Sequence, residues 1–122
     1  MIPGRYDFSI YKGGTYKTKV VGEDNAGLTV DFTQYTDLRM QIRLPYQDST
    51  DPLLELSLAN GGISKVEANL ALELYISAEN TAAFNWEVAL YDLELIIVDV
   101  GNDTIIDKLL YGKITTVPEV TL

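Results

Sequence analysis

Leu38-Arg39-Met40-Gln41-Ile42-Arg43-Leu44 is the stretch that decides the fold, because apolar and polar residues alternate along it without a break. Successive side chains of a strand point to opposite faces, so the four apolar residues share one face and Arg39, Gln41 and Arg43 share the other. Pro45 follows and ends the strand, since proline has no N–H to donate to a sheet ladder. This stretch predicts a strand with one buried face and one solvated, cationic face.

The same alternation recurs on both sides of this strand, separated by turn residues. Glu23-Asp24-Asn25-Ala26-Gly27 and Asn60-Gly61-Gly62 are typical of turns, because Asn tolerates left-handed dihedral angles and Gly readily adopts them. Residues 63–68 have too weak a pattern for an assignment. The strands that we expect span residues 6–11, 15–21, 28–32, 38–44, 54–58, 70–76, 86–100 and 104–117.

About eight strands at short spacing and one helical turn indicate an all-β chain. We expect an antiparallel, immunoglobulin-like β-sandwich with Greek-key connections, and a closed barrel is the alternative. The helical turn is expected after Ser77, a residue type that favours helix N-caps. The Cys…Trp…Cys signature of antibody domains is absent. Length favours a single domain over residues 1–122, with 1–5 as an irregular lead-in and 118–122 as an apolar docking tail.

Two features of the last strands carry further structural expectations. Leu95-Ile96-Ile97-Val98 is a nearly continuous apolar run, which suggests burial on both faces. Gly112 interrupts the final strand, where an isolated glycine suggests a β-bulge.

Composition narrows the chemistry available to this chain. It has no cysteine and no histidine, which excludes disulfides, thiolate zinc sites and histidine-dependent catalysis. The net charge of −9 disfavours nucleic-acid and anionic membrane partners, and the group Lys12, Lys17 and Lys19 is too sparse for a basic patch. No apolar run approaches the roughly 18 residues of a membrane span, and the N-terminus lacks an apolar signal core.

Carboxylates are the remaining candidates for catalysis or metal binding. Asp92 and Glu94 are expected on one strand face about 7 Å apart, a separation that suits a glycosidase pair. The favoured interpretation is a solvated face with ion pairs to Arg39 or Arg43 on a neighbouring strand. The acidic stretches 23–25 and 99–103 could offer oxygen ligands to calcium, but neither has EF-hand spacing and turn chemistry explains them. We expect no catalytic residue, cofactor site or metal site.

Aromatic residues near the N-terminus are the candidate partner-binding set. Tyrosine is enriched at protein interfaces because it is large and amphipathic, although it is also a good strand former. Exposed sheet edges would add a means of recruiting another chain by strand pairing. The candidate residues are Tyr6, Phe8, Tyr11 and Tyr16.

Three groups of segments, taken in order, carry a family resemblance. They are 31–43, with Asp31-Phe32-Thr33 leading to Arg39-Met40-Gln41-Ile42-Arg43; 54–63, with Leu54-Glu55-Leu56-Ser57 and Asn60-Gly61-Gly62-Ile63; and Tyr91-Asp92-Leu93-Glu94-Leu95 followed by 109–113 and Pro118-Glu119-Val120-Thr121. Together they resemble a family of small tailed-bacteriophage and prophage virion proteins. They are similar also to the N-terminal attachment domain of phage baseplate upper proteins. The likeness covers about residues 6–122.

The resemblance implies a non-enzymatic β-sandwich module that attaches one virion part to another, assembled in the host cytoplasm. Its partners would be other virion proteins, including further copies of itself. Because no receptor-binding domain follows Leu122, a standalone tail, baseplate or fibre attachment subunit is expected. A capsid decoration or head–tail joining protein is the alternative within that class. A carbohydrate-binding sandwich and a carboxylate-based hydrolase are the alternatives outside it.

Overall fold

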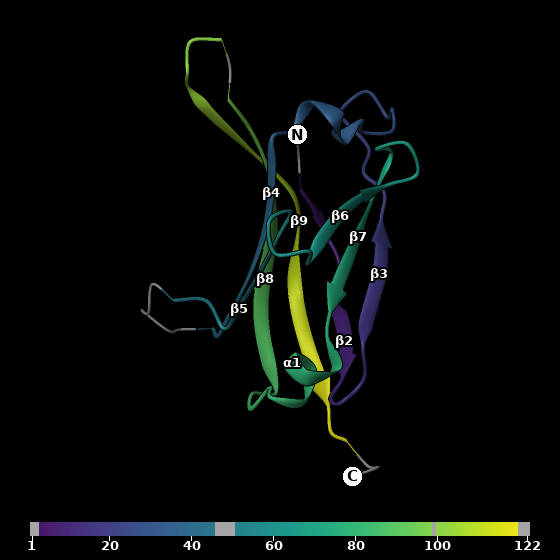
Figure 1. Cartoon of the computed structure of the whole chain (residues 1–122), viewed down its shortest axis with the longest axis vertical. Helices are drawn as coiled ribbons and strands as arrows, with labels where there is room; N and C mark the ends of the chain where they lie inside the picture. Colours follow the sequence, from purple (N-terminus) through teal and green to yellow (C-terminus); the bar gives the residue numbers. More distant parts are fainter. Residues whose placement is uncertain (1–2, 46–50, 99, 120–122) are drawn as a thin grey trace.

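The computed structural model describes residues 3–45, 51–98 and 100–119, and this part of the chain forms nine strands in two sheets (Figure 1). The mostly-β architecture predicted from the alternating pattern is therefore confirmed. The strands are β1 (Gly4–Arg5), β2 (Phe8–Tyr11), β3 (Tyr16–Val20), β4 (Asp37–Arg43), β5 (Leu54–Ser57), β6 (Ile63–Val66), β7 (Ala71–Ile76), β8 (Val88–Val98) and β9 (Thr104–Val117).

The larger sheet has the order β1-β9-β8-β4-β5, with β2 also pairing with β9, and the smaller sheet has the order β3-β7-β6. The expectation of antiparallel sheets is wrong at one edge, because β1 and β2 both run parallel to β9. These strands come from opposite ends of the chain, so no tight turn joins them. Both parallel and antiparallel pairing with β9 were therefore possible. Alternation within a strand does not specify the direction of its neighbour.

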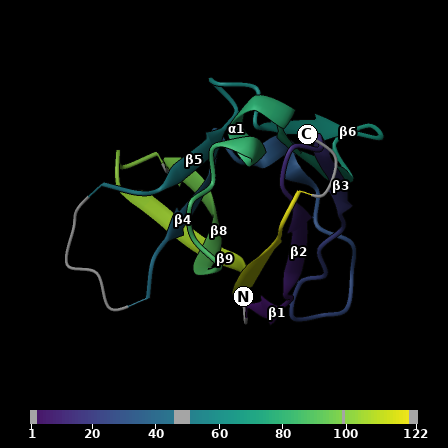
Figure 2. The same ribbon diagram turned by 90° about the horizontal axis from the view of Figure 1, so that it is seen from below.

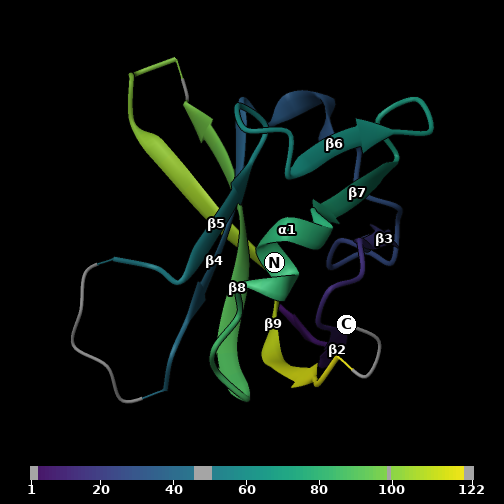
Figure 3. The same ribbon diagram turned by 60° about the horizontal axis from the view of Figure 1, so that its bottom comes forward.

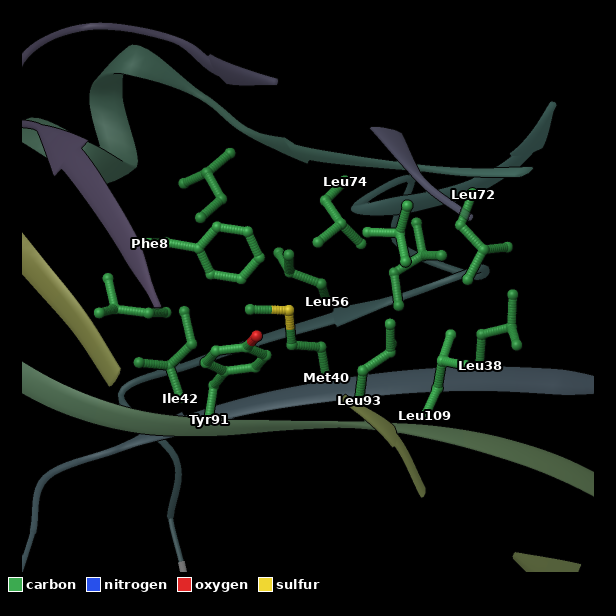
Figure 4. Close-up of a cluster of buried hydrophobic side chains, with 14 of the residues drawn as sticks. Phe8, Leu38, Met40, Ile42, Leu56, Leu72, Leu74, Tyr91, Leu93 and Leu109 are labelled. Carbon is green, nitrogen blue, oxygen red and sulfur yellow. The ribbon is translucent and has the colours of Figure 1, made fainter. Parts of the chain in front are cut away.

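The two sheets pack face to face and enclose the core. Seen from below in Figure 2, β3 and β6 lie on one side and β4, β5 and β8 on the other. Figure 4 shows Leu72 and Leu74 of the smaller sheet opposite Leu38, Met40 and Leu93 of the larger one. All five side chains are almost completely buried, as the alternation predicted.

Strand β4 holds a central place in the larger sheet, because it pairs with β5 on one side and with β8 on the other. Leu38, Met40 and Ile42 are buried, whereas the residues between them are only partly covered. Arg39, Gln41 and Arg43 thus lie on the outer face of the sheet, as predicted.

Several predicted elements differ from those observed. Residues 28–32 contribute only a single bridge, Glu23 to Thr29, and Phe32–Gln34 form a 3-10 turn. The Asp31 carboxylate caps that turn by accepting a hydrogen bond from the Thr33 N–H, a local bond that competes with strand pairing. Residues 63–66, which had no assignment, form β6, and two residues of the expected irregular lead-in form β1.

The helical turn is confirmed as α1 (Ala78–Ala82), with the Ser77 hydroxyl accepting a hydrogen bond from the Asn80 N–H. Thr81 of this turn is fully buried. Its hydroxyl donates to the Gly14 carbonyl at 2.7 Å and accepts from the Gly13 N–H at 3.1 Å. The helix therefore fixes the turn between β2 and β3. No helix in the described residues is both long and apolar enough to cross a membrane.

The expected bulge at Gly112 is wrong. The irregularity lies between Leu93 and Glu94, which pair with Leu110 and Lys108, so that Leu109 is the extra residue in β9. Gly112 serves a different purpose. A Cβ placed on it would lie 2.2 Å from the Tyr6 carbonyl oxygen, so glycine lets the link between β1 and β2 pass against β9.

The tail and one loop were also singled out by the sequence. Of the predicted docking tail, only Pro118 and Glu119 are described, and both lie outside the strands. Residues 46–50 of the polar loop at 45–52, and residues 120–122 of the tail, lie outside the described residues.

Candidate interaction surfaces

The outer face of the larger sheet carries a shallow groove of about 720 Å³. It crosses β4, β8 and β9, whose outward side chains form its floor. Five of the nine Lys and Arg residues of this acidic chain gather here. These cations are Arg5, Arg39, Arg43, Lys108 and Lys113.

Two carboxylates on the same face offset part of that positive charge. Lys108 Nζ lies 2.7 Å from Asp92 Oδ2 and 2.8 Å from Glu94 Oε2. Arg39 Nη2 lies 2.7 Å from Glu94 Oε1, and the pairing of β4 with β8 places these two residues directly opposite each other. The ion pair predicted between the outer face of β8 and Arg39 is therefore present. Arg39 and Lys108 therefore form an ion-paired cluster with Asp92 and Glu94 within this groove.

The protonation of Glu94 decides what this cluster can do chemically. Burial by itself raises the pKa of Glu94, but hydrogen bonds from Lys108 and Arg39 outweigh it and hold the pKa below its ordinary value of 4.5. A glycosidase needs one carboxyl group with a raised pKa to donate a proton. This geometry keeps Glu94 ionised at neutral pH, so it gives the hydrolase hypothesis no proton donor at Glu94.

Acidic turns were the candidate metal ligands. In the 23–27 turn, the Asp24 carboxylate accepts hydrogen bonds from the backbone N–H groups of Ala26 and Leu28, at 2.9 and 3.0 Å. That is the local bonding for which Asp is favoured in turns. Across the described residues, no three Asp or Glu side chains come close enough together to hold a metal ion. Asp99 of the second acidic stretch lies outside the described residues.

The four predicted partner-binding aromatics divide into two groups. Phe8 is buried, and its ring centroid lies 4.9 Å from that of Tyr6, 5.7 Å from that of Tyr16 and 5.0 Å from that of Tyr91. Burial raises the pKa of Tyr16 to about 12. Phe8 is thus a core residue with Tyr16 packed beside it, whereas Tyr6 and Tyr11 are 57% and 68% exposed and offer their rings to solvent. Tyr11 is not part of the ring cluster.

Part of the apolar run that the sequence predicted to be buried is exposed. The β8–β9 hairpin extends beyond the body in Figures 1 and 3, and we call its described residues 96–98 and 100–106 the arm. Leu95 is buried, but Ile96 and Ile97 are half-buried and Val98 is 48% exposed, so burial of this run on both faces is wrong for the single chain. Ile105 and Ile106, which pair with Ile97 and Ile96, are also exposed.

The body holds the base of the arm firmly. The Thr36 N–H donates to the Ile96 carbonyl at 2.8 Å, and the Tyr35 hydroxyl donates to Asp107 Oδ2 at 3.2 Å. Ile97 still packs against the core at the base of the arm, whereas Val98, Ile105 and Ile106 remain 44–48% exposed within the described part of the chain. This exposed surface could have been predicted from the sequence. Apolar pairs flank the turn on both sides, and an isolated two-stranded ribbon cannot bury both of its faces.

We compared the chain with known protein families and with curated proteins. No family model matches the chain, and no curated protein matches it either.

Proposed function

We propose that this chain is a non-enzymatic structural protein of a bacteriophage virion, a tail, baseplate or fibre attachment module that acts by protein–protein assembly. A capsid decoration or head–tail joining role is the alternative. The family resemblance of the sequence suggests the particle, and the exposed surface of the arm supports the mode of action. Other virion proteins are its partners, and the virion is its location after assembly in the host cytoplasm.

The observation that carries the assembly role is the apolar arm. Val98, Ile105 and Ile106 are each 44–48% exposed on a ribbon with open edges. Val98 and Ile106 share one face of the ribbon, where apolar exposure of this kind marks an interaction site, and an open strand edge is a template for another chain. Burial of these side chains against a partner would supply the hydrophobic part of the binding free energy.

We propose that the fold is an immunoglobulin-like sandwich of the variable type. In such domains strands B, E and D form one sheet, and strands C and C′ join F and G in the other. Taken in chain order, β3 to β9 have the places of B, C, C′, D, E, F and G, and they divide between the two sheets in the same way. The arm is then the F–G hairpin, at an end where variable domains bind partners, which is an analogy of fold alone.

Purified particles provide the test. We expect mass spectrometry of phage particles from the source of this sequence to detect the chain in a fixed copy number, and a map of the particle to place the arm in a protein contact. Deletion of the chain should give particles that lack a tail, baseplate or fibre component. Intact infectious particles without this chain, assembled at normal yield, would contradict the proposal.

A further inference from the structure

One edge of the arm has no strand beside it within the described chain. Strand β8 occupies one side of β9, and on the other side β1 begins only at the pairing of Gly4 with Leu110. The backbone N–H and C=O groups along Thr104–Lys108 on that side therefore have no sheet partner among the described strands. Flanking this edge are apolar side chains on both faces of the ribbon.

We infer that this edge pairs with the same edge of a second copy of the chain, antiparallel and about a two-fold axis through Ile106. The inference rests on the proposed function for the role of the arm, and it deepens that function by naming the partner. Two-fold symmetric pairing is the commonest way in which identical chains associate, and it uses one surface twice.

The charges along β9 select the register. In a symmetric antiparallel pair, directly opposed side chains must lie on the same face, so the axis passes through a residue and not between two residues. With the axis at Ile106, that residue meets its own copy, Thr104 meets Lys108, and Ile105 meets Asp107. No two like charges are directly opposed, and the central contact is apolar on apolar.

The neighbouring registers place like charges opposite each other or require a turn residue to pair as strand. An axis at Ile105 places Asp103 opposite Asp107, and an axis at Asp107 or Lys108 places that charged residue opposite its own copy. An axis at Thr104 requires Asn102 to pair as strand, but Asn102 has a φ of +62° and belongs to the turn. The Ile106 register is the one that both charge and backbone geometry permit.

The same pairing would bring apolar side chains of the two copies into lateral contact on each face of the sheet. It would form a four-stranded ribbon in which Ile96 and Ile106 of both copies share one face, with Ile97 and Ile105 of both copies on the other. The net charge of −9 makes two copies repel each other, which salt screens. Apolar contact between the two arms would oppose that repulsion.

A single introduced cysteine tests the register, because the chain has no cysteine of its own. Ile106→Cys would face its own copy with Cα atoms roughly 4.5–5.5 Å apart, which a disulfide can span. Thr104→Cys, two residues along the same edge, would lie about 14 Å from its own copy and cannot be bridged. Val21→Cys, at a 60% exposed site away from the arm, measures random collision.

Mild oxidation of the purified chain in moderate salt, followed by a non-reducing gel, gives the readout. We expect at least tenfold more covalent dimer from Ile106→Cys than from either control. Equal yields from all three variants, or more dimer from Thr104→Cys, would overturn the inference. Such a failure would leave the attachment role open, because the particle experiment tests that role without assuming that the partner is a second copy.

Discussion

Replacement of Gly112 by alanine tests how the N-terminal link is held against the last strand. The added Cβ would lie 2.2 Å from the Tyr6 carbonyl oxygen and 2.8 Å from Asp7 Oδ1. Because the Tyr6 oxygen and carbon are backbone atoms, a rotamer change cannot relieve the overlap. The link between β1 and β2 must instead move away from β9 by about 1 Å to reach an ordinary carbon–oxygen contact.

The cost follows from the bonds that such a movement breaks. The link is held by three hydrogen bonds: Tyr6 N–H to the Tyr111 carbonyl at 2.9 Å, Tyr91 hydroxyl to the Tyr6 carbonyl at 2.7 Å, and Lys113 N–H to Asp7 Oδ1 at 2.9 Å. Each contributes about 1 kcal/mol. Alanine also lowers the conformational entropy of the unfolded chain, which stabilises the folded state by about 0.5–1 kcal/mol. The free energy of unfolding should therefore fall by about 2–2.5 kcal/mol.

Urea denaturation at neutral pH measures this loss. With a slope of about 1.5 kcal/mol per molar urea, the midpoint should fall by about 1.5 M. The matched control is Gly4→Ala in the neighbouring strand, where the nearest atom, Leu110 Cδ2, lies at an ordinary 3.5 Å. That control should change stability by less than about 0.5 kcal/mol. A Gly112→Ala midpoint within experimental error of the native chain would refute the argument from close approach.

Three further stability predictions rest on single contacts. Ala68 has a φ of +57°, a strained value for any residue with a Cβ, so Ala68→Gly should raise the free energy of unfolding by about 0.5–1 kcal/mol; a loss in thermal unfolding would contradict this. Thr81→Val removes the hydroxyl that bonds the β2–β3 turn and should cost about 1–3 kcal/mol in urea, whereas Thr81→Ser should retain most of the stability. Because the pKa of Glu94 is lowered in the folded chain, its contribution is complete well above 4.5 and is lost as the pH falls through the folded value. Glu94→Gln should therefore cost about 1–2 kcal/mol at pH 7 and much less at pH 3, and equal costs at both pH values would exclude the ion-pair explanation.

The candidate surfaces were only partly predictable from the sequence. The pairing of Glu94 with Arg39 could be anticipated, because alternation puts both residues on outer strand faces and opposite charges favour adjacent strands. Lys108 as the third member could not, since its position depends on the bulge at Leu109. Without that extra residue, continuing the register from Leu93 and Leu110 would set Leu109, not Lys108, opposite Glu94. The aromatic set was similarly divided, with Phe8 in the core and Tyr11 in solvent, although both occupy the same strand.

The sequence by itself determined the mostly-β class, the inward and outward faces of β4, and the helix cap at Ser77. Each depends on residues close together in the chain, through the two-residue strand period or a hydrogen bond across three residues. Only the tertiary structure decided that β1 and β2 run parallel to β9, that the link between them passes over Gly112, and that the end of the apolar run of β8 is exposed in the arm. These outcomes depend on which distant segments become neighbours and on how far each strand extends beyond the opposite sheet. Local alternation predicts which face of a strand is apolar, but it does not predict whether another part of the chain packs against that face.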